Sequence, residues 1–259
     1  VQTYAVKNLK KGIEFLEQQF GVKWDWDAFW KNAQMYNDTS RCMVEKWDVN
    51  CTDHPQVCGA ALALQREYEF MAAACMDKFM HKTDLRVTKM MLKGYEQDKA
   101  ANAPQPKYRC LVWACPAHYY TNFTYWTQHC WGVTCVNDKE QALADLVRCY
   151  EKMMMRSHTN GGYVNLLDEC WKMCEKFHTN IVIMYDHVSC KNVGGLHGLF
   201  EDQARERGIH LIWIPHDVMD PRTVSRREMR EAFSQYMVTV LNEKPLDPTL
   251  LDYEDALSW

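Results

Sequence analysis

The stretch that decides the fold is residues 181–195, with the sequence IVIMYDHVSCKNVGG. Its first five residues are apolar and two of them are isoleucines, a composition typical of a buried β-strand. A polar turn with one thiol, Cys190, and two glycines follows. In open α/β sheets, ligands bind in the crevice outside the carboxyl ends of the strands. Cys190 is therefore a candidate metal or cluster ligand, or a nucleophile, and the alternative is a small buried hydrophobe.

The chain on the amino-terminal side of this strand shows helical patterns. Apolar residues recur at the spacing of an amphipathic helix over residues 4–20. A second helix follows, with Asp25 or Asp27 as its N-cap, and residues 58–80 resume the pattern. Residues 1–103 are therefore predicted to form an all-helical region.

The rhythm changes after a segment with two prolines, and residues 104–259 alternate strands with helices. Such alternation predicts a parallel sheet with both faces covered. The predicted fold class is α/β, a four-stranded doubly wound parallel sheet preceded by an all-helical region. The expected strands are residues 110–114, 132–136, 181–185 and 210–214, and the expected helices are 119–129, 138–155, 163–177, 196–207 and a last one starting at a capping box at Ser225.

Polar residues follow each predicted strand, and they are the candidates for chemistry. The carboxyl ends of parallel strands meet at one edge of a sheet, so the loops after them would line a common crevice. Besides Cys190, the candidate crevice-lining residues are Cys115, His118, His187, Ser189, Lys191, His216 and Asp217.

Several chemistries stay open for this set. A nucleophilic triad would combine Cys190 or Cys115 with His216 and Asp217. A zinc site would use Cys115, Cys190 and His216. The spacing of these residues selects neither site. The two glycines at 194–195 would let a phosphate approach a helix N-terminus, but the G-x-G-x-x-G and P-loop patterns are both absent.

The amino-acid composition and net charge of the chain argue against some classes of binding partner. The chain is 47% hydrophobic and 25% charged, as in ordinary globular proteins. Its net charge of -4, without long blocks of one sign, argues against nucleic acid and anionic membrane surfaces as partners. No apolar run approaches the roughly 18 residues of a spanning helix, and residues 1–20 lack the apolar middle of a signal peptide. These features predict a cytoplasmic protein.

The chain has twelve cysteines, an even number that is high for its length. Together with Asn-x-Ser/Thr triplets at Asn37, Asn50 and Asn122, this number would suit a secreted disulfide protein. Several cysteines fall on predicted buried faces, Cys170 and Cys174 among them, which favours a reducing and anaerobic cytoplasm instead. No Cys-x-x-Cys occurs, so a cluster would take its ligands from distant loops.

Residues 189–237 carry a family resemblance. Its elements are Ser189-Cys190-Lys191, the strand-like GIHLIWI at 208–214, HDVMDPR at 216–222 and the helix at 226–233. Taken together they resemble the carboxyl-terminal part of the alpha-type subunit in the 2-hydroxyacyl-CoA dehydratase family, with benzoyl-CoA reductase subunits as more distant kin. The likeness is good from about Tyr108 onward and weaker over the helical region.

The resemblance implies a lyase of anaerobic amino-acid fermentation. Members pair an alpha with a related beta subunit, each holding a 4Fe-4S cluster on three cysteines. A separate ATP-hydrolysing iron-sulfur activator injects one electron. The acyl-CoA substrate then passes through a ketyl radical, expels its 2-hydroxyl and becomes a 2-enoyl-CoA. The resemblance leaves open whether FMN is also bound.

Only Cys190 carries over, as the carboxyl-terminal cluster ligand. The other two cysteines are expected from a preceding α/β domain, which would make Val1 an internal residue of a longer subunit. Cys115 matches no ligand of the family, and no catalytic residue is assigned. The alternatives are a subunit of a benzoyl-CoA-reductase-like enzyme and a cofactor-free scaffold subunit.

Overall fold

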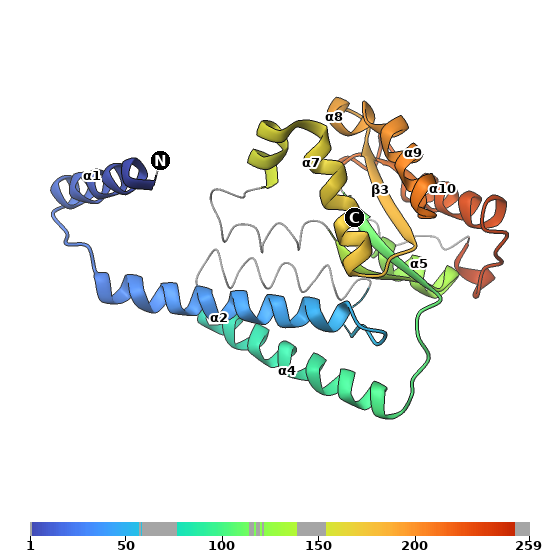
Figure 1. The fold of residues 1–259 in the computed structure, drawn as a ribbon, viewed down its shortest axis with the longest axis horizontal. Helices are drawn as coiled ribbons and strands as arrows, with labels where there is room; N and C mark the ends of the chain where they lie inside the picture. Colours follow the sequence, from blue (N-terminus) through green and yellow to red (C-terminus); the bar gives the residue numbers. More distant parts are fainter. Residues whose placement is uncertain are drawn as a thin grey trace.

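A computed structural model describes residues 2–56, 58, 77–113, 117, 120, 122–138 and 154–251 (Figure 1). Most of the predicted helices at 58–80 and 138–155 lies outside these residues. Two of the candidate site residues, Cys115 and His118, also lie outside them.

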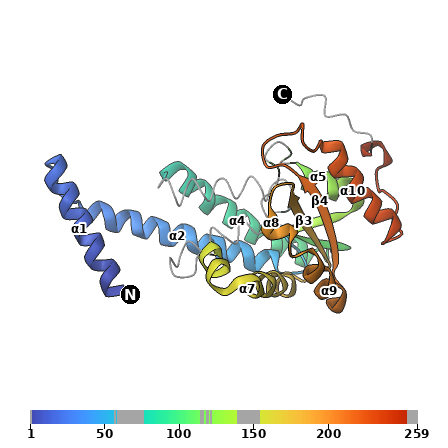
Figure 2. The same cartoon turned by 90° about the horizontal axis from the view of Figure 1, so that it is seen from above.

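The helices before the sheet are α1 (Gln2–Phe20), α2 (Trp26–Asn50) and α4 (Lys78–Ala100). The predicted N-cap of the second helix is confirmed, because the Asp25 carboxylate accepts a hydrogen bond of 2.8 Å from the Ala28 N–H. Helices α2 and α4 lie side by side, and α1 lies at the far end of α2, away from the sheet (Figures 1 and 2).

The contact between α2 and α4 is unusually polar. The Lys46 ammonium pairs with the Asp84 carboxylate, and both side chains are buried. Thr39 hydrogen-bonds His81 across the same contact at 2.8 Å. A buried pair of this kind fixes how two helices align, because shifting one helix would leave a charge unpaired inside the protein.

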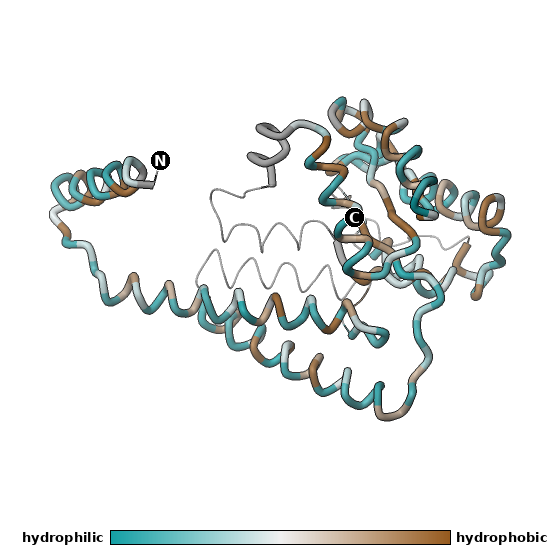
Figure 3. The backbone as a smooth tube through the Cα atoms, viewed as in Figure 1, coloured by the Kyte–Doolittle hydropathy of each residue, from teal (hydrophilic) through white to brown (hydrophobic). Residues whose placement is uncertain are grey.

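The sheet has four strands, all parallel, in the order β2-β1-β3-β4. The predicted fold class is therefore confirmed. The stretch at 181–195 begins with the central strand β3, whose first five residues are all buried, and Figure 3 shows hydrophobic colour along it. The strands are β1 (Tyr108–Trp113), β2 (Val133–Asp138), β3 (Ile181–His187) and β4 (His210–His216).

Helices cover both faces of the sheet. Helices α5 (Phe123–Trp131) and α10 (Arg226–Thr239) pack on the face that carries Ile183 and Tyr185. Helices α7 (Met154–Lys176) and α9 (His197–Arg207) pack on the opposite face. The short elements are α8 (Lys191–Gly194) and η2 (Pro248–Leu250).

Local signals in the sequence are borne out in these helices. Ser225 and Glu228 form the predicted capping box at the start of α10. Gly162 interrupts α7 with a φ of 67°, a conformation that glycine adopts without strain. Helix α4 ends at Ala100 and β1 begins at Tyr108, so the change of rhythm falls at the two prolines. A division into two domains at residue 103 stays a prediction.

One arginine joins the helical region to the sheet. Arg109, on β1, is only 8% exposed. Its two terminal nitrogens donate to the carbonyls of Asn50 and Thr52 at 2.7 and 2.8 Å, and its Nε donates to the Phe177 carbonyl at 3.0 Å. Three carbonyls from two distant segments thus depend on one side chain.

We predict that Arg109→Met lowers the free energy of unfolding by about 2–5 kcal/mol, because it leaves buried carbonyls without donors. Urea titration followed by circular dichroism measures the change. Arg86→Met on the exposed side of α4 is the control, expected within about 0.5 kcal/mol of the wild type. Equal effects of the two substitutions would contradict the role given to Arg109.

Candidate functional site

The strand order reverses between β1 and β3, since β1 has β2 on one side and β3 on the other. In doubly wound sheets this switch point is where ligands bind, at the carboxyl ends of the strands. The loop after β3, which carries Cys190, lies at this place. The loop after β1 includes Cys115 and His118, outside the described residues.

Cys190 is the residue that precedes α8, and its backbone is held on both sides. Its N–H donates to the His187 carbonyl at 2.9 Å, and its own carbonyl accepts from the Gly194 N–H at 3.1 Å. The side chain is half-buried. Lys191, next to it, is exposed.

Three of the predicted site residues meet around the His187 ring. Ser189 approaches Nδ1 with both its backbone N–H, at 3.1 Å, and its hydroxyl, at 2.9 Å. Because a backbone N–H can only donate, Nδ1 is the acceptor and the ring proton sits on Nε2 in the neutral form. Nε2 faces the Asp217 carboxylate at 4.0 Å.

Asp217 is well suited to face an imidazole. The backbone N–H groups of Asp220 and Met219 donate to its carboxylate at 2.9 and 2.8 Å. These two bonds hold the pKa of Asp217 below its ordinary value, and nearby His187 adds to the effect. The carboxylate is therefore charged at neutral pH.

His216 was expected in the loop after the fourth strand, but it is a buried residue of that strand. It is the last residue of β4, it is 1% exposed, and its ring packs 5.0 Å from that of Tyr185 and 5.4 Å from that of His187. The predicted strand ended at residue 214, but β4 continues to 216 opposite His187. Of the two histidines, His187 is the one whose ion-pair contact with Asp217 is seen.

His197, the first residue of α9, is partly buried. Its ring stacks on Trp213 with centroids 3.6 Å apart, and its Nε2 is 3.3 Å from the Asp186 carboxylate. This contact fixes the start of α9 against the end of β3. It is a structural contact on the opposite face from His216.

The described residues supply one thiol at this edge, that of Cys190. Within them, no three His, Cys, Asp or Glu side chains gather closely enough to hold a metal ion. The described part of the chain therefore does not complete a cluster site, and the role of Cys190 as a ligand stays a prediction. The zinc site that would use Cys115 stays untested, because Cys115 lies outside the described residues.

Sequence reasoning did not identify two arginines of α10 that contact one tyrosine. Arg230 of α10 is 6% exposed, and its Nη1 donates to the Tyr120 hydroxyl at 3.1 Å. Arg226 lies over the same ring, with its guanidinium carbon 5.4 Å from the ring centre. Their spacing along α10 could have indicated this contact, because both arginines lie on the helix face that carries the buried Phe233 and Met237.

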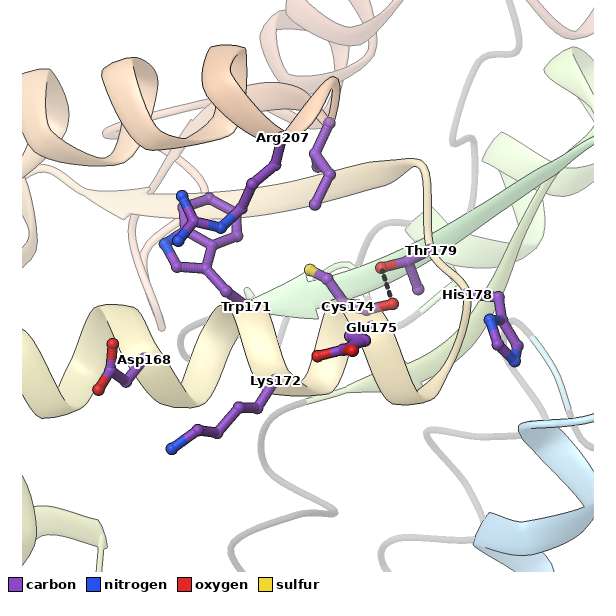
Figure 4. Close-up of a pocket in the computed structure, with 9 residues that line it drawn as sticks. Asp168, Trp171, Lys172, Cys174, Glu175, His178, Thr179 and Arg207 are labelled. Atoms are coloured by element: carbon purple, nitrogen blue, oxygen red, sulfur yellow. Dashed lines mark hydrogen bonds between the residues drawn. The ribbon is translucent and has the colours of Figure 1, made fainter.

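A separate pocket of about 580 Å³ opens at the other end of the sheet (Figure 4). It lies near the starts of β3 and β4, because His178 and Ile209 line it. The Arg207 guanidinium lies 5.2 Å from the Trp171 ring centre above it. Hydrogen bonding from Cys170 lowers the pKa of the Cys174 thiol.

Cys170 and Cys174 are both buried in the core, as the sequence predicted. Cys174 lines the pocket but is 2% exposed. This pocket faces away from the Cys190 loop, so it is not part of the crevice.

The fold defines a doubly wound α/β protein, and among the described cysteines Cys190 is the one in a loop at its switch point. Residues 1–237 match the family described as 2-hydroxyglutaryl-CoA dehydratase, D-component. The chain belongs to this family, which confirms the resemblance seen in the sequence, and it is a component of a 2-hydroxyacyl-CoA dehydratase. No individual curated protein matches its sequence. In the part of the chain that the structure describes, no helix is long and apolar enough to cross a membrane.

The loop after β4 contains Asp220, a carboxyl whose pKa is lowered. Bonds from the Arg222 guanidinium and backbone N–H lower the pKa of Asp220 to about 2. We predict that Arg222→Gln raises this pKa part of the way toward 3.8, because the backbone bond remains. A carboxyl with a lowered pKa stabilises the fold above its unfolded pKa, and this contribution disappears as the pH falls toward 2.

Carbon-detected NMR titration of the Asp220 carboxyl measures the change. Arg205→Gln, which removes the similar exposed partner of Asp202 on α9, is the control and should leave the Asp220 pKa unchanged. An Asp220 pKa that does not move in Arg222→Gln would show that the side chain contributes nothing.

Proposed function

We propose that this chain is the alpha-type subunit of a cytoplasmic (R)-2-hydroxyacyl-CoA dehydratase, a lyase that removes water from its substrate to give a 2-enoyl-CoA. The observation that carries the proposal is the position of Cys190, which is half-buried at the switch point of the sheet. The chain that holds it belongs to a family of dehydratase components. Its partners would be a related beta subunit and an ATP-dependent iron-sulfur activator.

Cys190 would provide one thiolate to a 4Fe-4S cluster, with the other ligands coming from outside the described residues. When bound, such a cluster supplies a low-potential electron and an iron that can polarise a substrate oxygen. The Cys190 backbone is fixed by its bonds to His187 and Gly194, so its sulfur is presented in one place.

The reaction is redox-neutral overall. One electron from the activator reduces the thioester carbonyl to a ketyl radical, the C2–O bond breaks and hydroxide leaves, and the β-carbon then loses a proton. The electron returns at the end, so the net change is loss of water. Such a radical needs a site that excludes water.

The residues of this chain suit that requirement. Tyr185, Phe123 and His216 form a buried wall beneath the crevice. Above it, the Ser189 hydroxyl and the His187 ring form a hydrogen-bonded pair beside Cys190. We propose that this pair orients the substrate hydroxyl, with the Asp217 carboxylate holding the ring in place.

The test is Cys190→Ser in protein purified without oxygen, together with its partner subunit. We expect the iron content of the complex to fall by the share of one cluster and dehydration of 2-hydroxyacyl-CoA to be lost, because an alcohol binds iron far more weakly than a thiolate. Cys51→Ser, in the turn after α2, is the control and should keep both.

Unchanged iron in Cys190→Ser would contradict the ligand assignment. A wild-type complex in which this chain holds no iron would instead identify a cofactor-free scaffold subunit. Reduction of benzoyl-CoA without dehydration of 2-hydroxyacyl-CoA would identify the reductase alternative.

A further inference from the structure

Helix α1 carries an apolar stripe that is largely exposed among the described residues. The stripe consists of Val6, Leu9, Ile13, Leu16 and Phe20. Leu9 is 69% exposed and Phe20 is 71% exposed, and α1 packs extensively on none of the described helices and strands. Figure 2 shows α1 at the far end of α2 from the sheet. Because helices in proteins are stabilised mostly by the packing of an apolar face, this stripe is a candidate contact surface.

The spacing of the stripe is that of a coiled coil. Its members follow one another at alternating intervals of three and four residues, which is the spacing of the a and d positions of a heptad. A helix face that packs on the core of a globular protein is broader, because it also includes apolar residues beside those positions. Here the neighbouring residues are Lys10 and Glu17 on one side and Gly12 on the other. A narrow seam of this kind fits one further helix.

The charges beside the stripe are complementary to those of a second copy of the chain. Lys10 and Glu17 each follow a d position, so they lie on the same side of the seam. If two copies of α1 pack antiparallel, with Leu9 of each against Ile13 of the other, this side of one helix faces the same side of the other in reverse order. Side chains of a helix tilt toward its N-terminus, so Lys10 of each copy then reaches toward Glu17 of the other. Parallel helices would place Gly12 beside Glu17 and form no ion pair there.

Glu17 is held in place for such a contact. Its Oε1 accepts from the Trp24 N–H at 2.9 Å, and its Oε2 lies 3.3 Å from the Lys23 ammonium. The bond from Trp24, with a smaller contribution from Lys23, holds the pKa of Glu17 below its ordinary value, so the carboxylate is charged at neutral pH. A carboxylate accepts several hydrogen bonds, so Glu17 can keep these two and still accept from Lys10 of a second copy.

We propose that α1 is a self-association surface, through which two copies of the chain pair by an antiparallel coiled coil of their first helices. Such a contact has twofold symmetry, so each favourable contact occurs twice. The 19 residues of α1 span roughly 28 Å, which lets Val6 pack against Leu16 outside the central contact of Leu9 with Ile13. The inference does not depend on the proposed function.

Sedimentation equilibrium on the full chain measures this association, and we expect the wild type to form dimers. Leu9→Gln should weaken the dimer by about 10- to 100-fold, because an apolar contact is lost in both halves of the pair. Phe15→Gln is the matched control. Phe15 is 58% exposed but lies off the stripe, so its loss should change the dimer Kd by no more than about twofold.

A charge exchange tests the antiparallel orientation. Lys10→Glu and Glu17→Lys should each weaken the dimer by about 5- to 30-fold, because each brings like charges together at two places. An equimolar mixture of the two variants should associate like the wild type, since both contacts of the mixed pair again join opposite charges. This recovery also shows that the lost bond of Glu17 to Trp24 is not the cause. Lys11→Glu, on the outer side of α1, is the control and should leave the dimer unchanged.

A chain that stays monomeric at about 100 µM would overturn the proposal, because a dimer with a Kd of about 10 µM would form there. Equal weakening by Leu9→Gln and Phe15→Gln would also overturn it, as would a mixture of the charge variants that fails to associate. If the monomeric chain instead binds vesicles of phosphatidylcholine and phosphatidylglycerol through Leu9, the stripe faces a lipid surface and the proposal is wrong.

Discussion

The structure depends on the buried guanidinium of Arg109. It sits on a central strand and bonds to Asn50, Thr52 and Phe177. Burial lowers the pKa of this arginine, which measures the penalty of keeping a charge away from water. Three bonds to carbonyls that would otherwise be unsatisfied offset the penalty only in one geometry. The end of α2 is therefore held in a fixed place on the sheet, and Asn50 reinforces it with a bond to β2 at 3.1 Å.

Because the sheet is fixed, the ends of its strands are fixed too, and they determine where the polar residues of the candidate site lie. The pairing of β3 with β4 continues to His187 and His216, and the Val188 N–H still bonds to the His216 carbonyl at 3.0 Å. Polar groups at this edge are thus positioned by ladder hydrogen bonds and not by a free loop. The pairing places His187 opposite His216, although 28 residues lie between them in the sequence. That explains how Ser189, His187 and Asp217 come together.

The sequence predicted the features that depend on local patterns. The parallel sheet, the Asp25 cap and the Ser225 capping box all followed from periodicity or from short motifs. The error was in strand length. Because side chains alternate along a strand, two extra residues put His216 on the same buried face as Ile214. The contact of Arg230 with Tyr120 joins segments that are distant in the sequence, so no local pattern predicts it.

Position, more than chemistry, separates Cys190 from the other cysteines. Burial raises the pKa of Cys51 and Cys130 to about 11 and that of Cys58 to about 12, so these thiols behave as small hydrophobes. Cys174 has a lowered pKa, but it lies in the core at the opposite end of the sheet. Among the cysteines of the described residues, Cys190 is the one placed in the loop after a central strand at the switch point. A metal ligand must be reachable as well as deprotonated, and the Cys190 side chain is half-buried whereas that of Cys174 is buried.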